Sequence, residues 1–596
     1  MSLEDRGLGH TTWDKNKAAG LSRLLADVLK IHRIKDLFEK YRDRSEEEFI
    51  DAVLKDMGVN TEVFSEELKN IPEKGAFVIV ANHPLGGIDA LIILKLLLAK
   101  RPDIKVLSNF MLTEIDSVNA RFIPTKIFSD RDSPDEGLST AGRHLAEGKP
   151  LCVFPAGKVS VYNLKSKSIK DSLWNQEVVN FIKNASVPIV PVYISGRNAL
   201  LFHLIQNISP VFRSIKLPEE FVQKPKQALI VRIGKPFPVK EQEEFENEHE
   251  FGRYLRIRTY LLAQPIDVKP FFRPKLFKKK DREVVPPRDH GIIVREIDRL
   301  VEEGFELYSN KSYKVIWTTS EYAPGILYEI GRLREITFRE IGEGTGKNID
   351  LDEYDLYYRH LFIWDTEEEK VVGAYRLGMG KEILERYGKR GFYLNSLFRL
   401  KPGFEEVLKE SIELGRSFIV KEYQLKPLSL FMLWKGILYY ILKNPDYRYL
   451  IGPVTISGEF SEFSKSLIIK HIRENYYNSQ LAALVKPRKE FIPEMDMTDP
   501  DIQLVDRYTK DDLKRLDKVI EDIELGGFRL PALLKKYLGQ NAQIIGFNVD
   551  PNFNNALDGL LVMDLFNVPM DTLEGLAKEL DDKEVLESIK ERRRQE

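Results

Sequence analysis

The chain has few of the features that mark secreted or membrane-spanning proteins. Its 596 residues include one cysteine, Cys152, so a disulfide framework is excluded and a reducing compartment fits. The first 17 residues are polar and charged, without the apolar core of a signal peptide. The apolar run at residues 90–99 is interrupted by Lys95 and has about half the ~20 residues of a spanning helix. We therefore expect any membrane contact to be peripheral.

The chain also lacks a charge excess and any internal repeat. It has 90 Lys and Arg against 92 Asp and Glu, a formal net charge of −2, which gives no global attraction to nucleic acid. A composition of 43% hydrophobic and 31% charged residues is typical of soluble globular proteins. Because single hydrophobic cores stop growing beyond about 250–300 residues, this length predicts at least two domains.

Short apolar runs alternate with helical patterns in two separate stretches, which predicts two α/β domains. In the first stretch we expect strands at 76–80, 104–107, 151–154, 189–194 and 228–233, and a helix at 89–100. In the second we expect strands at 360–364, 371–377, 418–420, 449–456 and 544–549, and a helix at 428–442. The predicted organisation is amphipathic helices over 1–60, a first domain over 61–264, a linker over 265–290 and a second domain over 291–596.

The linker region carries five prolines between residues 265 and 288, and a basic, Phe-rich stretch at 271–280. One interpretation is a solvated connection between domains. The other is a membrane-surface patch, because each Lys or Arg near anionic headgroups contributes ~1 kcal/mol and Phe side chains can insert beside them.

The first motif with chemical content is Ala-Asn-His-Pro-Leu-Gly-Gly-Ile-Asp at residues 81–89. A strand delivers His83 to a loop, two glycines allow a tight turn, and Asp89 opens a helix. The carboxylate can orient the imidazole, which then takes a proton from an acceptor hydroxyl. With a thioester as acyl donor, no serine or cysteine nucleophile is needed. The alternative is that Asp89 caps the helix and His83 is an ordinary loop residue.

Three blocks in order resemble the glycerolipid acyltransferases, which include lysophosphatidic-acid acyltransferase. They are Asn82-His83 with Asp89, Phe-Pro-Ala-Gly-Lys-Val-Ser at 154–160, and Val-Pro-Ile-Val-Pro-Val at 187–192. The resemblance covers about residues 76–237 and implies His83 and Asp89 as catalytic residues. It implies an acceptor-binding set of Arg131, Phe154, Pro155, Gly157 and Lys158.

Two departures from that family bear on the acceptor. Five residues separate His83 from Asp89, where the family usually has four. Ala156 and Val159 replace a Glu and an Arg that help the family hold the acceptor's phosphate, so a bidentate phosphate donor is missing and Lys158 is a partial substitute. We therefore expect an acceptor hydroxyl on a lipid without glycerol phosphate; lost activity is the other interpretation.

The second half contains acidic and basic residues at the ends of predicted strands: Asp352, Asp355, Arg376, Glu413 and Arg416. An amino-acid acceptor needs an arginine for its carboxylate, and a carboxylate or ordered water to accept a proton from its ammonium group. The alternative is that these residues form ordinary ion pairs.

The set resembles the GNAT-type N-acyltransferases of ornithine-lipid synthesis, which are relatives of the acyl-homoserine-lactone synthases. The matching motifs are Asp-Glu-Tyr-Asp at 352–355, Tyr-Arg-Leu at 375–377, Gly-Phe-Tyr at 391–393, Glu-Leu-Gly-Arg at 413–416 and Leu-Trp-Lys-Gly at 433–436. The resemblance covers about residues 333–458. It implies Glu413 as proton acceptor and Asp352, Asp355, Arg376 and Arg416 as substrate-binding residues.

The same resemblance implies that acyl groups come from acyl carrier protein. Pro427 stands where CoA-binding GNAT enzymes have a glycine, and proline offers no N–H to a phosphate. Lys421, Lys426 and Lys435 would favour encounter with an acidic carrier.

Together, the two halves resemble fused enzymes that N-acylate an amino acid, ornithine or glycine, with a 3-hydroxyacyl group and then O-acylate the 3-hydroxyl. The resemblance implies acyl carrier protein, or CoA, as carrier of the donors, with no bound cofactor or metal. It implies amino-acid and lyso-aminolipid substrates, no nucleic-acid partner, and a cytoplasmic enzyme peripherally bound to the inner membrane. The alternatives are a lysophospholipid acyltransferase with a regulatory C-terminal half, or a non-enzymatic, hemolysin-like membrane-binding protein.

Overall fold

The structure, a computed structural model, describes residues 39–595 apart from 58, 109–115, 126, 128–135, 164–167, 196–227, 264–281, 342, 425, 494, 496, 498, 525–527 and 552. Contacts divide the chain into two compact units. The first comprises Met1–Ile266, Met497–Val505 and Leu525–Gly527; the second comprises Asp267–Asp496, Asp506–Glu524 and Phe528–Glu596. The candidate residue Arg131, the basic stretch 271–280 and the predicted helices before residue 39 lie outside the described residues.

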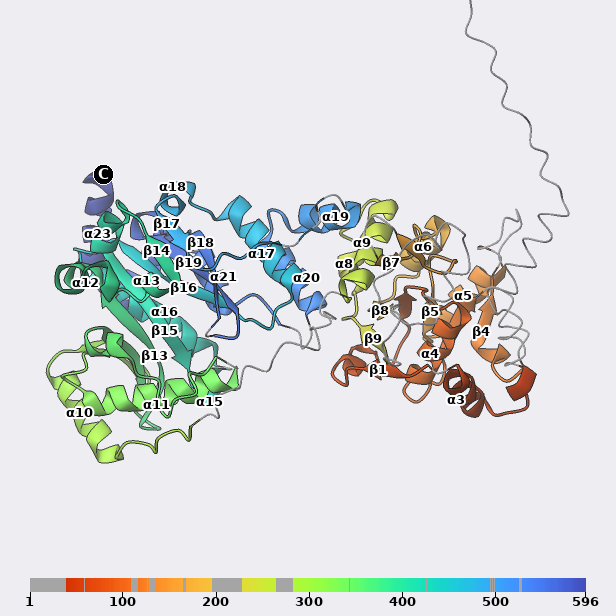
Figure 1. Cartoon of the computed structure of the whole chain (residues 1–596), viewed down its shortest axis with the longest axis horizontal. Helices are drawn as coiled ribbons and strands as arrows, with labels where there is room; N and C mark the ends of the chain where they lie inside the picture. Colours follow the sequence, from red (N-terminus) through yellow and green to blue (C-terminus); the bar gives the residue numbers. More distant parts are fainter. Residues whose placement is uncertain are drawn as a thin grey trace, which may run out of the picture. The chain divides into compact units, whose positions relative to one another are not determined.

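The first unit is built on a seven-stranded sheet in which all neighbours are parallel except β8 and β9 (Figure 1). The spatial order is β1 (Thr61–Val63), β9 (Leu229–Ile233), β8 (Ile189–Ile194), β2 (Val78–Ala81), β5 (Leu151–Val153), β3 (Lys105–Ser108) and β4 (Phe122–Pro124). The helices include α3 (Glu46–Asp56), α4 (Gly87–Leu97), α5 (Glu136–Ala146), α6 (Gln176–Asn184) and α9 (Glu248–Leu261). Parallel strands covered on both faces read as continuous apolar runs, which made them recognisable in the sequence.

Helix α4 begins two residues earlier than expected, which places Asp89 in its first turn. Gly86 at the N-cap has φ +68°, a left-handed conformation that glycine adopts without steric cost. Eight of the eleven residues of α4 are buried, so this is a core helix that is apolar on all sides.

The segment Met497–Val505 is distant in sequence but belongs to the first unit by its contacts. Asp499 Oδ2 lies 2.7 Å from Lys170 Nζ, and Asp501 Oδ2 lies 2.5 Å from Arg256 Nη1. Residues from the C-terminal half of the sequence therefore complete the first unit.

The second unit is built on an eight-stranded sheet (Figure 1). Its order is β10 (Glu306–Asn310), β11 (Tyr313–Thr318), β12 (Arg359–Asp365), β13 (Lys370–Met379), β15 (Ser411–Ile419), β16 (Tyr449–Ile456), β19 (Ala556–Asp564) and β18 (Gln543–Asp550). All neighbours are antiparallel except β15 and β16, which pair in parallel over three residues, from Ser411 and Tyr449 onward, and then separate. The helices that matter for the site are α11 (Pro324–Glu340), α16 (Pro427–Leu442) and α21 (Ala532–Leu538).

The strand register sorts the side chains of this sheet between its two faces. Arg376 pairs with Gly415, two residues after Glu413, so Arg376 and Glu413 share one face. Tyr375 and Leu414 point to the opposite face.

The α/β prediction for both halves is confirmed. One local expectation was wrong: Glu413 and Arg416 lie inside strand β15, not beside a short strand at 418–420. The charged residues and Gly415 break the apolar alternation by which the strand would have been recognised. No helix within the described ranges is both long enough and apolar enough to cross a bilayer.

Candidate active sites

His83 lies on the loop after β2, beside the fully buried carboxylate of Asp89. His83 Nδ1 is 3.0 Å from Asp89 Oδ2, which also accepts a hydrogen bond from the Leu85 N–H at 2.8 Å. Burial raises the Asp89 pKa, and the neighbouring His83 opposes that rise. Nδ1 and Oδ2 are close but not aligned as a strict hydrogen bond, which is common in unliganded general-base sites. This arrangement leaves Nε2 of His83, whose side chain is 17% exposed, for an acceptor hydroxyl.

The loop that carries His83 is held at both ends. The side chain of Asn82 donates to the Ile194 carbonyl at 2.8 Å and accepts from the Ile194 N–H at 2.7 Å, so it continues the β2–β8 pairing past the strand end. The left-handed turn at Gly86 brings the chain back into α4. The extra residue between His83 and Asp89 is thus absorbed without separating the pair.

The second block forms the neighbouring wall. The ring of Phe154 lies 4.5 Å from the His83 ring, centroid to centroid. The carbonyl of Pro155 accepts a backbone hydrogen bond, and Gly157, with φ +61°, closes a tight turn through its N–H to the Phe154 carbonyl at 3.0 Å. Lys158 is exposed and makes no ion pair with any described residue.

Asp171, which the sequence analysis missed, connects these loops. Its buried carboxylate accepts hydrogen bonds from the His83 N–H at 3.2 Å, Ser160 Oγ at 2.5 Å and Trp174 Nε1 at 3.2 Å. Its carbonyl accepts from Arg256 Nη2 at 2.9 Å. Asp171 lies in no motif and is 88 residues from His83, so local pattern gave no signal.

A covalent intermediate on the buried thiol does not fit this site. Cys152 is completely buried, and burial raises its pKa, so it is not a thiolate nucleophile. Among the residues that the structure describes, no group of three or more His, Cys, Asp and Glu side chains is arranged to hold a metal ion.

In the second unit, Asp352, Asp355 and Arg376 belong to a buried network of opposite charges. Arg376 Nη1 lies 2.5 Å from Asp352 Oδ1 and 3.2 Å from Asp355 Oδ1. Arg334, also missed in the sequence analysis, donates to Asp350 Oδ2 and Asp355 Oδ2, both at 2.9 Å. Burial alone would raise the Asp355 pKa, but the two arginines hold it well below its usual range. This network is a charged scaffold beneath the site.

Glu413 is 1% exposed and fully bonded. Its carboxylate accepts hydrogen bonds from Tyr358 Oη, the Tyr393 N–H at 3.2 Å and the Leu394 N–H at 2.7 Å. Burial raises its pKa to about 7 in spite of these bonds. Neither Glu413 nor its partner Tyr358 lines the cavity described next, so a proton would reach Glu413 through a relay such as a water molecule.

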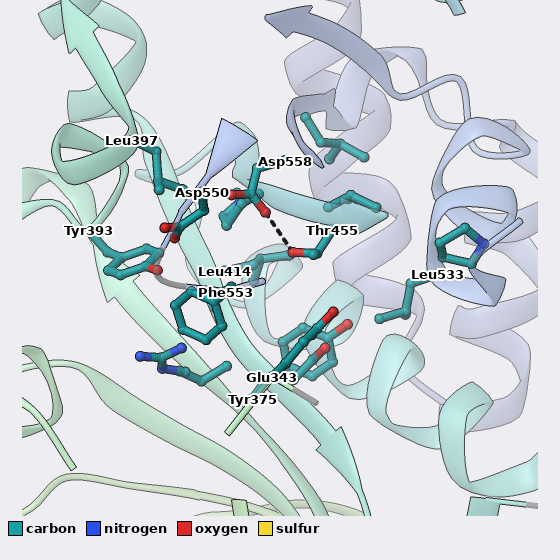
Figure 2. A pocket seen from close by; sticks show the side chains of 18 of the residues that line it. Glu343, Tyr375, Tyr393, Leu397, Leu414, Thr455, Leu533, Asp550, Phe553 and Asp558 are labelled. Atoms are coloured by element: carbon teal, nitrogen blue, oxygen red, sulfur yellow. Dashed lines mark hydrogen bonds between the residues drawn. The ribbon is translucent and has the colours of Figure 1, made fainter. Parts of the chain in front are cut away.

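A cavity of about 220 Å³ opens where β15 and β16 separate (Figure 2). Arg416 lines it in a left-handed backbone conformation, φ +51°. Its guanidinium lies 5.5 Å from the centre of the Tyr393 ring and 5.2 Å from that of Phe553. Its nearest carboxylate oxygens, on Asp350 and Asp352, are 3.6 and 3.8 Å away. Arg416 is thus placed to bind a carboxylate entering the cavity.

Three carboxyl groups line the same cavity: Glu343, Asp550 and Asp558. Figure 2 shows Asp550 and Asp558 beside Tyr393. Thr455 Oγ1 donates to Asp558 Oδ1 at 2.7 Å, while burial, followed by the charges of Asp550 and Glu343, raises the Asp558 pKa to about 7. The sequence analysis missed these acids; their signal was the placement of Asp550 just after the predicted strand at 544–549.

The start of α16 bears on two predictions about the acyl carrier, the proline in place of a glycine and the basic docking surface. Pro427 is the first residue of this helix, and the Ser429 N–H donates to the Lys426 carbonyl at 3.1 Å. Lys421 and Lys426 are exposed. Lys435 does not belong to an exposed docking surface: it is 5% exposed, and its Nζ lies 2.5 Å from Glu579.

Two protein families match the chain in separate regions. The acyltransferase family matches residues 17–269, and the acetyltransferase (GNAT) domain family matches residues 333–435. The chain is an acyltransferase that carries an acyltransferase domain followed by a GNAT domain.

The similar proteins include enzymes with two different names. Glycine N(alpha)-acyltransferase of Bacteroides thetaiotaomicron is 29% identical over 284 residues, 46% of this chain and 82% of that protein. Lyso-glycine lipid O-acyltransferase of Phocaeicola vulgatus is 24% identical over 223 residues, 36% of this chain and 77% of that protein. The solved 1-acyl-sn-glycerophosphate acyltransferase of Thermotoga maritima covers 40% of the chain at 19% identity, with a TM-score of 0.22.

Proposed function

We propose that the chain is a bifunctional acyltransferase of aminolipid synthesis. The second unit joins a 3-hydroxyacyl group to the amine of an amino acid, and the first unit then esterifies the 3-hydroxyl with a second acyl group. The observation that carries the proposal is the cavity at the β15–β16 separation, whose lining includes Arg416, Asp550 and Asp558. A cation and carboxylates across one cavity complement the carboxylate and ammonium of a free amino acid.

The N-acylation step follows from these groups. Arg416 binds the acceptor carboxylate, and a buried carboxylate with a pKa of about 7, Asp558 or Glu413, takes the proton of the ammonium group. The free amine attacks the thioester carbonyl, a C–N bond forms, the C–S bond breaks and the carrier thiol leaves. Arg376, which was expected to bind the substrate, is buried and absent from the cavity lining, so its proposed role is to keep Asp352 and Asp355 in place.

The O-acylation step uses the His83–Asp89 pair. Asp89 orients the imidazole through Nδ1, and Nε2 takes the proton of the lipid hydroxyl as that oxygen attacks a second thioester. A C–O bond forms, the C–S bond breaks, and the imidazolium returns the proton to the leaving thiolate. The product contains no glycerol phosphate, which agrees with the missing arginine at Val159.

The remaining parts of the proposal concern partners and place. The acceptor is glycine or ornithine; the names of the relatives favour glycine. Acyl carrier protein supplies the donors, as the Pro427 helix start suggests, with CoA as the alternative carrier. The enzyme acts in the cytoplasm at the surface of the inner membrane, where its lipid product accumulates.

The test is reconstitution with purified protein and lipid analysis by mass spectrometry. Glycine or ornithine and 3-hydroxyacyl carrier protein should give a mono-acyl aminolipid, which a second acyl carrier protein converts to the two-tailed lipid. A parallel reaction with lysophosphatidic acid tests the alternative function, that of a glycerolipid acyltransferase. Phosphatidic acid as the sole product would contradict the proposal. A reaction that yields no acylated amino acid, whether the 3-hydroxyacyl group is carried by acyl carrier protein or by CoA, would also contradict it.

A further inference from the structure

The cavity of the second unit passes from one face of the sheet to the other. Tyr393 and Arg416 line it beside the charged network. Tyr375 and Leu414, whose side chains alternate with those of Arg376 and Glu413, line it from the opposite face. A through-sheet opening of this kind lets two substrates approach one reaction centre from opposite sides.

The two ends of the cavity differ in polarity. The Tyr375 end is lined mainly by apolar residues: Leu414, Val454, Pro531, Leu533 and Leu561. Figure 2 shows Leu533 across the cavity from Asp550 and Asp558. Since the polar end fits an amino acid, the apolar end fits the hydrocarbon chain of the acyl donor.

Two phenol groups stand in this apolar end. Tyr375 on β13 and Tyr537 on α21 are 4% and 3% exposed, and their hydroxyl oxygens lie 3.3 Å apart. An O–H···O bond is normally about 2.5–3.0 Å long, so this is a loose contact. Each hydroxyl offers one donor and two acceptor sites, and the pair leaves part of that capacity unused even with Ser417 bonded to Tyr375.

The position of the Tyr375–Tyr537 pair relative to the reacting carbonyl indicates which part of the donor the pair would contact. Arg376 pairs with Gly415 while Ala374 pairs with Phe418, so β15 bulges opposite Tyr375, beside the turn of chain that carries Arg416. If the thioester carbonyl of the donor reacts near Arg416, carbon 3 of the acyl chain lies close to that carbonyl, and the rest of the tail lies further along the cavity. A hydroxyl on carbon 3 is the first polar group along the acyl chain beyond the thioester.

We infer that the Tyr375–Tyr537 pair is the recognition site for the 3-hydroxyl of the donor, and so selects 3-hydroxyacyl over plain acyl thioesters. This inference rests on the proposed function of the second unit. The donor hydroxyl inserts between or beside the two phenols and replaces their long contact with bonds of normal length. A plain acyl chain offers no partner, and leaves the buried hydroxyls with their loose contact.

The competing role is a core tyrosine pair that only stabilises the packing of α21 against the sheet. The two roles differ in one measurable quantity, the ratio of kcat/KM for matched donors with and without the 3-hydroxyl. Loss of a packing contact changes both donors alike, whereas loss of a recognition contact changes their ratio.

The experiment compares 3-hydroxypalmitoyl and palmitoyl carrier protein as donors to the amino acid accepted by the wild-type chain. Tyr537→Phe and Tyr375→Phe each remove one hydroxyl and keep the ring. Tyr423→Phe is the matched control, because Tyr423 is buried and bonds to Asp365 at 2.8 Å but does not line the cavity. Thermal melting of all variants shows whether they fold.

We expect the wild-type preference for the hydroxylated donor, measured as the ratio of kcat/KM values, to fall about 5- to 30-fold in either cavity variant, because the lost hydrogen bond affects that donor. The control should keep the wild-type ratio. Equal losses with both donors in the folded variants, or an unchanged ratio, would overturn the inference while leaving N-acylation itself in place. A wild-type chain that transfers neither donor to any amino acid would overturn the proposed function and this inference with it.

Discussion

The two candidate sites are held together in different ways. In the first unit, His83 stands on a loop beside Asp89, and that loop is tied to its neighbours by Asn82 and by three hydrogen bonds to the Asp171 carboxylate. In the second unit, Arg334 and Arg376 cross-link the buried carboxylates of Asp350 and Asp355 and the partly buried carboxylate of Asp352. A loop site separates chemistry from stability, so its residues can be changed with local effects. In a site embedded in a buried charge network, the same residues serve chemistry and stability. The effect of each substitution on activity must therefore be measured together with its effect on stability.

Replacing His83, the proposed catalytic base, should give the largest effect on one activity. His83→Ala should lower O-acylation by about 10²–10⁴-fold, the usual cost of losing a general base. Because the loop is secured by Asn82 and Asp171, folding and N-acylation should be unchanged, so mono-acyl aminolipid accumulates. Mass spectrometry of both lipids measures this. His249→Ala, at an exposed position of the same unit, is the control. Wild-type amounts of two-tailed lipid in His83→Ala would disprove the assignment.

Removing one charge from the scaffold of the second unit should mainly cost stability. Asp355→Asn leaves Arg334 and Arg376 buried with one carboxylate fewer, and such losses typically destabilise by about 3–5 kcal/mol. Chemical denaturation followed by circular dichroism measures the change. Asp446→Asn removes an exposed pair with Lys381 and should cost at most about 1 kcal/mol. If both variants lose the same small amount, the network is not the scaffold described here.

The pH profile of N-acylation identifies which buried carboxyl accepts the proton. Burial raises the pKa values of Glu413 and Asp558 to about 7. A proton acceptor must be deprotonated, so the rate should rise with pH up to about 7, by at most about tenfold per unit, and level off above it. Glu413→Gln and Asp558→Asn each remove one candidate. The variant that loses both the rate and the pH dependence identifies the acceptor. A wild-type rate that does not change between pH 5 and 8 would exclude both carboxyl groups as the proton acceptor.

The segment Met497–Val505 should have the smallest effect, on the first site only. Asp501 bonds Arg256, which also bonds the Asp171 carbonyl, and Asp171 in turn bonds the His83 N–H. Asp501→Asn should lower kcat of O-acylation about 3- to 10-fold without changing KM, because a positioning contact is worth roughly one hydrogen bond to a charged group. Asp501→Glu should restore part of the rate, and exposed Glu250→Gln should change nothing. A KM effect alone would assign Asp501 to substrate binding instead.

The sequence was most informative where chemistry and local pattern coincide. Buried central strands gave continuous apolar runs, so β8 and β16 were predicted with their observed bounds. Strand β19 was not predicted, since Asp558 and Gly559 interrupt its apolar run like a turn.

Motif spacing predicted which residues to examine, but not how they are arranged. His83 and Asp89 are near in sequence, and the structure brings them together. Asp171, Asp558 and Tyr537 have no distinguishing neighbours, and their positions depend on contacts between distant segments. Such placement follows from packing of the whole unit, which no local window of sequence contains.

The return of Met497–Val505 to the first unit has a practical consequence for dividing this protein. A gene cut in the proline-rich linker would yield an N-terminal fragment that lacks its own Asp499 and Asp501, leaving Lys170 and Arg256 without these ion-pair partners. The C-terminal fragment would carry the segment Met497–Val505, which belongs to the first unit. The order of residues along the chain is therefore not the order of its folded parts, and a fragment meant to contain the whole first unit must include residues from beyond the linker.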